Sequence, residues 1–106
     1  MGDLPRPPAI HQEFVNRYQK LGQAWELIAK QGAEGPLDAT TSRLVKLGIA
    51  IGAMREGAVH SCARKALAQN ITPEALEQVV ALAAGTLGMP ATVAAYTWVR
   101  DVTHPE

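Results

Sequence analysis

The stretch from residue 55 to residue 80, REGAVHSCARKALAQNITPEALEQVV, decides the fold of this chain. Its first part predicts a helix over about residues 56–69, and NIT at 70–72 predicts a turn. Thr72 suits the N-cap of a following helix, because Pro73 then occupies the first helical position, where no backbone N–H is needed. The stretch therefore predicts two helices joined by a short turn.

Helical patterns continue on both sides of this stretch. A final helix is predicted over about residues 91–99, and Asp38 is a plausible N-cap for a helix that runs to residue 54. Gly48 and Gly52 lie four apart on that helix, so another backbone could approach closely there. A further helix is predicted near the N-terminus from apolar residues spaced by four and three, which are Ile10, Phe14, Tyr18, Leu21, Trp25 and Ile28.

No β-type alternation appears between these segments, so the chain is predicted to be all-α, a compact bundle of about five helices. We expect a flexible tail at residues 1–8 and a single helical domain over residues 9–106. The apolar stripe from Ile10 to Ile28 is expected to be either core or a surface for a partner helix, and not a cofactor site.

The composition points to an assembly. Ten basic residues balance ten acidic ones, which does not fit a nucleic-acid-binding protein. Hydrophobic residues make up 47% of the chain and charged residues only 19%, against roughly 25% charged residues in average globular proteins. A buried interface between copies would resolve this shortage of polar surface, so a homo-oligomer is expected.

One segment, residues 78–99, carries no charge and is long enough to span a bilayer. It is rich in Ala, Thr and Gly, and GMP at 88–90 interrupts it, because proline cannot continue the helical hydrogen bonds. Two buried helices that meet at GMP are therefore predicted, with no membrane span. The first ten residues do not resemble a secretory signal, and a cytoplasmic protein is expected.

Cys62 and His60 are close in sequence but do not share a helix face. Residues two apart on a helix point about 200° apart, so these side chains do not easily form a nucleophile–base pair. Cys62 is the only cysteine, which excludes an intrachain disulfide and a CxxC motif within one subunit. Its thiol is either a small apolar filler or a thiolate favoured by Arg55 and Arg43.

His60 shares its helix face with Glu56 and Arg64, each four residues away. Glu56 and His60 are either a base with its orienting carboxylate or a solvent-exposed surface pair. The other histidines, His11 and His104, lie on different elements, and no metal-ligand spacing occurs. No metal site and no cofactor are therefore predicted.

Residues 37–95 resemble the carboxymuconolactone decarboxylase / alkylhydroperoxidase D-like superfamily. The resemblance rests on the opening LD…T, HS.ARKAL, ITPEALEQVV and TLGMPA taken together. It implies a compact all-helical fold that assembles as trimers or hexamers. It also implies one of two activities: decarboxylation of a carboxylated lactone, or peroxiredoxin-type reduction of hydroperoxides with electrons from a thiol donor.

The peroxidase-like members of this superfamily use the pattern E-x11-C-x2-C-x3-H, in which Glu and His relay protons for a dithiol. Here those four positions hold Arg43, Arg55, Ala58 and Cys62, so the dithiol signature is absent. The two arginines beside the thiol suit an anion pocket for a small carboxylated ligand, because guanidinium groups bind carboxylates bidentately. They equally suit an interface network of ion pairs.

Three functions follow from this reading. The first is a family enzyme, a lyase or oxidoreductase, acting on a small carboxylated or peroxidic molecule. Its expected catalytic residues are Cys62, His60 and Glu56, and its expected substrate-binding residues are Arg43 and Arg55. The second is a catalytically silent oligomeric binding or scaffold protein of the same fold. The third is a single-cysteine redox protein.

Overall fold

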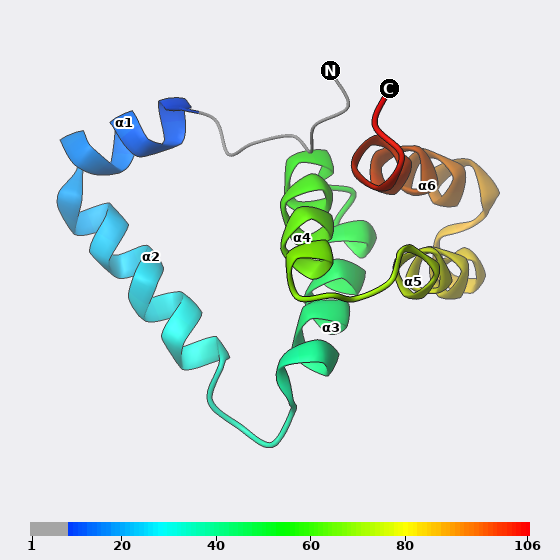
Figure 1. Ribbon diagram of the computed structural model, residues 1–106, viewed down its shortest axis with the longest axis horizontal. Coiled ribbons are helices and arrows are strands. Elements are labelled where there is room, and N and C mark those ends of the chain that lie inside the picture. Colours follow the sequence, from blue (N-terminus) through cyan, green and yellow to red (C-terminus); the bar gives the residue numbers. More distant parts are fainter. Residues whose placement is uncertain (1–8) are drawn as a thin grey trace.

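The computed structural model describes residues 9–106, and these residues form six helices (Figure 1). They are α1 (Ala9–Arg17), α2 (Gln19–Gly32), α3 (Ala39–Gly52), α4 (Glu56–Ala68), α5 (Pro73–Leu87) and α6 (Met89–Thr103). The described residues contain no strand, so the all-α prediction is confirmed. The predicted tail at residues 1–8 lies outside the described residues.

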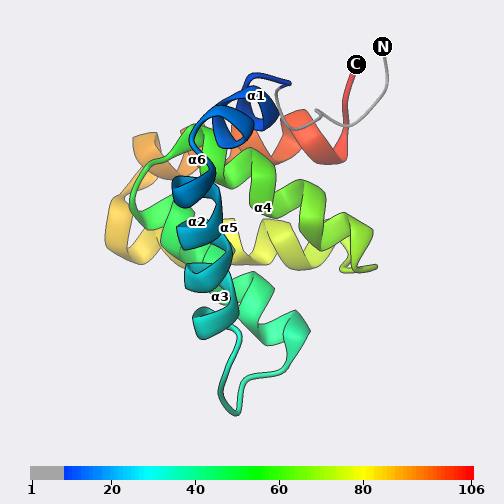
Figure 2. The same cartoon turned by 90° about the vertical axis from the view of Figure 1, so that its left-hand side faces the viewer.

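Helices α3 to α6 form a four-helix body, and α1 and α2 project from it as an arm, Ala9–Gly32 (Figures 1 and 2). In the body, α4 packs against α3 and α6, and α5 packs against the same two helices. Side chains from all four helices fill the core, and the largest fully buried ones are Leu47, Ile51, Leu76, Val59, Val99 and Val102. The body therefore has a hydrophobic core of its own.

The prediction of one continuous N-terminal helix is wrong, because the chain bends at Tyr18. This residue has φ −116° and ψ 70°, outside the helical region, and it separates α1 from α2. Gly22 permits the close approach of the two helices, since a Cβ at this position would lie 3.2 Å from the Cβ of Val15. The apolar spacing of four and three continues across the bend, so periodicity alone does not reveal it.

The uncharged stretch at residues 78–99 folds as two helices, as predicted, but these helices are buried on one side only, and Leu82, Met89 and Val93 are exposed. Gly88 has φ 82° and separates the end of α5 at Leu87 from the start of α6 at Met89. This backbone conformation favours glycine, because a Cβ disfavours the left-handed region. No helix in the described part of the chain combines the length and the apolar character needed to cross a membrane.

Both predicted N-caps are present. The hydroxyl of Thr72 accepts a hydrogen bond from the backbone N–H of Ala75 at 3.2 Å, and Pro73 follows as the first residue of α5. Asp38 Oδ1 accepts one from the backbone N–H of Thr41 at 2.7 Å at the start of α3. Hydrogen bonds from Thr41 stabilise the carboxylate and lower the pKa of Asp38.

We expect Asp38→Ala to lower the denaturant midpoint of the body at neutral pH and to have little effect in acid. The folded-state pKa of Asp38 is lowered, so its stabilisation is fully present above the unfolded-state value of about 3.9. It is lost as the pH falls through the folded-state pKa. Urea unfolding at pH 7 and at a series of decreasing acidic pH values measures where this difference disappears. Asp38→Asn is the control, because asparagine still caps a helix but does not titrate.

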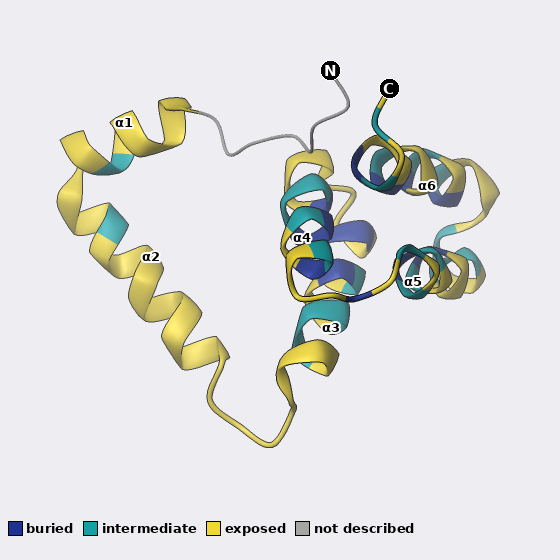
Figure 3. Ribbon diagram, viewed as in Figure 1, coloured by how far each residue is buried: buried dark blue, intermediate teal, exposed yellow. Residues whose placement is uncertain are grey.

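The arm contributes no residue to the core. Figure 3 shows α1 and α2 exposed along almost their whole length, and neither helix has a buried residue. Every side chain of the predicted apolar stripe is exposed, namely Ile10, Phe14, Tyr18, Leu21, Trp25 and Ile28. The stripe therefore does not belong to the core of this chain. The other role expected for it is a surface for a partner helix.

Candidate functional site

Helix α4 carries the candidate catalytic residues, and it presents them on two different sides. His60 faces α6, because its ring contacts a side chain of that helix. Arg55 and Cys62 lie on roughly the opposite side of α4, since each residue turns an α-helix by about 100°. The five predicted site residues therefore do not form one cluster within a single chain.

On the α6 side, His60 is paired with Asp101. His60 Nε2 lies 3.0 Å from Asp101 Oδ2, and the two residues are 41 positions apart in the sequence. The side chains are 21% and 47% exposed, so the pair lies at the edge of the body, in reach of solvent. An ionised carboxylate only accepts hydrogen bonds, so Nε2 is the donor and this contact fixes the orientation of the ring.

Glu56 joins this pair from the first turn of α4. A carboxylate oxygen of Glu56, a ring nitrogen of His60 and a carboxylate oxygen of Asp101 all lie within 4.8 Å of one another. The predicted proximity of Glu56 and His60 is therefore present, but the carboxylate that is hydrogen-bonded to the ring is that of Asp101. We call these three residues the α4–α6 cluster.

An imidazole and two carboxylates are also donors that bind divalent transition metals. Within the cluster, His60 Nε2 and Asp101 Oδ2 form a hydrogen bond. The α4–α6 cluster therefore combines a hydrogen-bonded imidazole–carboxylate pair with a neighbouring carboxylate.

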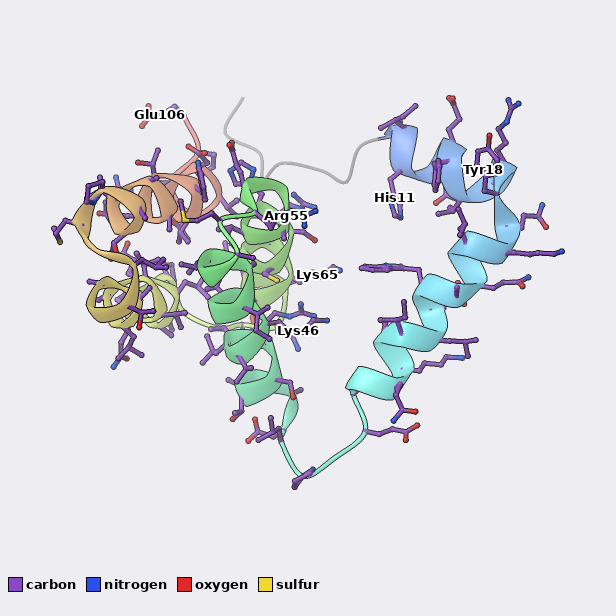
Figure 4. The ribbon with its side chains drawn as sticks, turned by 180° about the vertical axis from the view of Figure 1, so that it is seen from behind. His11, Tyr18, Lys46, Arg55, Lys65 and Glu106 are labelled. Atoms are coloured by element: carbon purple, nitrogen blue, oxygen red, sulfur yellow. The ribbon has the colours of Figure 1, made fainter. Side chains whose placement is uncertain are left out.

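Arg43 and Arg55 lie on the other side of α4, and each has different surroundings. Arg43 Nε donates a hydrogen bond to Gln69 Oε1 at 3.0 Å, which links α3 to the residue that follows α4. Arg55 is the N-cap residue of α4 and is exposed. Neither guanidinium has a carboxylate within 4.0 Å among residues 9–106. Figure 4 shows Arg55 and Lys65 on the side of the body that faces the arm.

The segment that contains α3 and α4 is strongly basic. Residues 39–68 hold five basic side chains, Arg43, Lys46, Arg55, Arg64 and Lys65, against the single acidic side chain of Glu56. The balance of ten against ten in the whole chain therefore hides a local excess of positive charge. An anionic ligand is attracted to such a surface.

Cys62 is a free thiol within the core. It is only 9% exposed and belongs to the cluster of buried apolar residues. A cysteine in these surroundings packs as a small hydrophobe.

Two hollows of the described surface lie away from these residues. One runs along α1, and the other is a groove between α3 and α5. Neither is lined by Cys62, by the two arginines or by the α4–α6 cluster.

Comparison with known proteins identifies the class to which this fold belongs. The sequence profile of the carboxymuconolactone decarboxylase family matches residues 19–101, which include α2 to α5 and most of α6. The chain therefore belongs to the carboxymuconolactone decarboxylase family. No curated protein and no solved structure matches the chain significantly.

Sequence reasoning missed the partner of His60. Asp101 belongs to another helix, and no local spacing connects it with α4. One signal was available, because Asp101 is the only acidic residue of α6 and, with Arg100, ends a run of 22 uncharged residues. A lone carboxylate on such a helix invites a search for its partner, but only the packing of α4 on α6 identifies His60.

Proposed function

We propose that this member of the carboxymuconolactone decarboxylase family is an enzyme for a small carboxylated molecule, with His60 as its proton-transfer group. The observation that carries the proposal is the 3.0 Å contact between His60 Nε2 and Asp101 Oδ2. It combines a half-buried imidazole with an orienting carboxylate from another helix. This arrangement is typical of a general acid–base pair.

In the proposed reaction, the bond between the substrate carbon and its carboxylate breaks, and carbon dioxide leaves. The electron pair of this bond stays on the substrate carbon and is delocalised into the unsaturated system of the substrate. Protonated His60 then delivers a proton to that carbon and is reprotonated from solvent. Asp101 holds the ring in its orientation, and Glu56 places a second carboxylate beside it.

The carboxylate of the substrate needs a cationic partner, and the chain offers two. Arg64 is half-buried and lies one helical turn after His60 on the same face of α4. Arg43 and Arg55, the arginines singled out in the sequence, lie on the side of α4 away from His60. Because a small molecule cannot bridge the two sides of a helix, we propose Arg64 for the substrate that reacts at His60. For Arg43 and Arg55 we propose a separate anion-binding surface.

We expect Arg64→Gln to raise the KM for a carboxylated lactone at least tenfold, since a charge-assisted hydrogen bond contributes about 1.5–3 kcal/mol. The double variant Arg43→Gln/Arg55→Gln should leave KM nearly unchanged. Arg17→Gln, on the arm, is the matched control. Steady-state consumption of the lactone, with carbon dioxide release as a second readout, measures all three variants.

A raised KM in Arg43→Gln/Arg55→Gln, with an unchanged KM in Arg64→Gln, would place the substrate on the α3 side and contradict the role of Arg64. No turnover by the wild-type protein above a heat-treated control would contradict the enzyme itself. A stable oligomer without turnover would instead support the silent binding or scaffold protein of the same fold.

We further propose that the chain works as a homo-oligomer in the cytoplasm, as a trimer or hexamer. The support is the low share of charged residues together with the exposed apolar side chains of the arm. A cytoplasmic location suits the free thiol of Cys62 and needs no disulfide.

A further inference from the structure

The arm presents an apolar face that its own chain does not cover. The well-packed helix pairs are α1–α2 in the arm and α3–α4, α4–α6, α5–α6 and α3–α5 in the body, so the arm packs mainly on itself. On α2, Leu21, Trp25 and Ile28 share one face, and all three are more than half exposed. Such a face in water marks an interaction surface.

The body has an uncovered groove of matching character between α3 and α5. Its volume is about 570 Å³, and none of its lining residues is charged; they include Val45, Gly48, Gly52, Val79 and Leu82. Most of its lining residues are apolar, and the polar ones are Thr41, Gln78 and Thr86. Amphipathic helices bind in such grooves through anchors at i, i+4 and i+7, and this is the spacing of Leu21, Trp25 and Ile28.

The two glycines of the groove are not needed for packing within the chain. A Cβ at Gly52 would have no neighbour within 4 Å, and one at Gly48 would meet only Val79 Cγ1 at 3.9 Å, an ordinary contact. Gly52 is the last residue of α3, but Gly48 lies inside the helix, where glycine costs about 1 kcal/mol relative to alanine. Their missing side chains leave room for a backbone that comes from outside the chain.

We propose that α2 of one copy lies in the α3–α5 groove of a second copy, with Leu21, Trp25 and Ile28 as its anchors. The exchanged arm then contacts the α3 side of the body. This inference rests on the proposed homo-oligomer and names its interface. It does not depend on the reaction proposed at His60.

The available area fits a stable interface. The three anchors offer roughly 100 Å² each, about half of what an aromatic side chain buries on average. The groove that covers them loses a comparable area, and each copy contributes one arm and one groove, so the exchange buries roughly 600 Å² per copy. Stable interfaces bury about 1,200–2,000 Å² over both partners, so an exchange between copies reaches the lower end of this range.

The test measures oligomer mass by sedimentation and light scattering at several concentrations, with matched substitutions. We expect Leu21→Gln in the arm and Leu82→Gln in the groove each to raise the dissociation constant at least tenfold. Leu27→Gln is the arm control, because Leu27 is as exposed as Leu21 but lies on the other side of α2. Met89→Gln is the body control, an exposed residue outside the groove.

Mixing the two weakened variants tests exchange between copies directly. The Leu82→Gln chain keeps an intact arm, and the Leu21→Gln chain keeps an intact groove, so differently tagged chains should associate more strongly with each other than with themselves. A monomeric wild-type protein would overturn the proposal and the homo-oligomer together, and would mean that the arm folds back or binds something else. An oligomer that is weakened equally by Leu27→Gln, or not restored by mixing, would overturn the arm exchange alone. Helical circular dichroism confirms that each variant is folded.

Discussion

His60→Gln should lower kcat for a carboxylated lactone by about 10²–10⁴-fold, the usual contribution of a positioned general acid or base. The physical reason is that, among residues 9–106, His60 is the only imidazole that a carboxylate from another helix holds, through the 3.0 Å contact with Asp101. Asp101→Asn should cause a smaller loss, because asparagine retains a hydrogen-bond acceptor for the ring N–H but not the negative charge of the carboxylate.

His104→Gln is the matched control for this prediction. His104 is exposed near the C-terminus, and its ring contacts the hydroxyl of the neighbouring Thr103, not a carboxylate. Its substitution should leave kcat unchanged. Full activity in His60→Gln would contradict the role of His60. An equal loss in all three variants would indicate a general structural effect, which thermal unfolding of each variant would reveal.

The body of the fold could be predicted closely from the sequence, because its helix ends depend on local chemistry. Asp38 and Thr72 cap α3 and α5 through hydrogen bonds to residues three positions on, an interaction that lies within one turn of sequence. Gly88 separates α5 from α6 through its own backbone conformation. The bend at Tyr18 was missed, because the apolar pattern is uninterrupted there and only Gly22 marks the close approach of the two helices.

The candidate site could be predicted only in part, for a related reason. Helix geometry alone places His60 with Glu56 and away from Cys62, and the structure agrees with this arrangement. The partner Asp101 depends on how α6 packs against α4, and a single sequence contains no local sign of that contact. The same holds for the hydrogen bond between Arg43 and Gln69, which joins residues 26 positions apart.

The reactivity of Cys62 should be strongly suppressed in the folded protein. The thiol is 9% exposed within the core, so an alkylating reagent reaches it only after the body opens. We expect iodoacetamide to label Cys62 at least about 100-fold more slowly in buffer than in urea, because a core position opens only with several kcal/mol of free energy. Mass spectrometry of samples quenched over time gives both rates.

Ala58→Cys in a Cys62→Ala background is the matched control. Residue 58 lies one turn earlier on the same side of α4 and is exposed, so this thiol should react at the rate of a free cysteine.

Slow labelling of Cys62 together with fast labelling at position 58 would show that burial protects the thiol of Cys62. It would remove the support for a single-cysteine redox protein and for peroxiredoxin-type chemistry. Fast labelling of Cys62, with a half-point well below the free-thiol value of about 8.5, would show an accessible thiolate. The α3 side of α4, with Arg43 and Arg55, would then replace His60 and Asp101 as the reactive site.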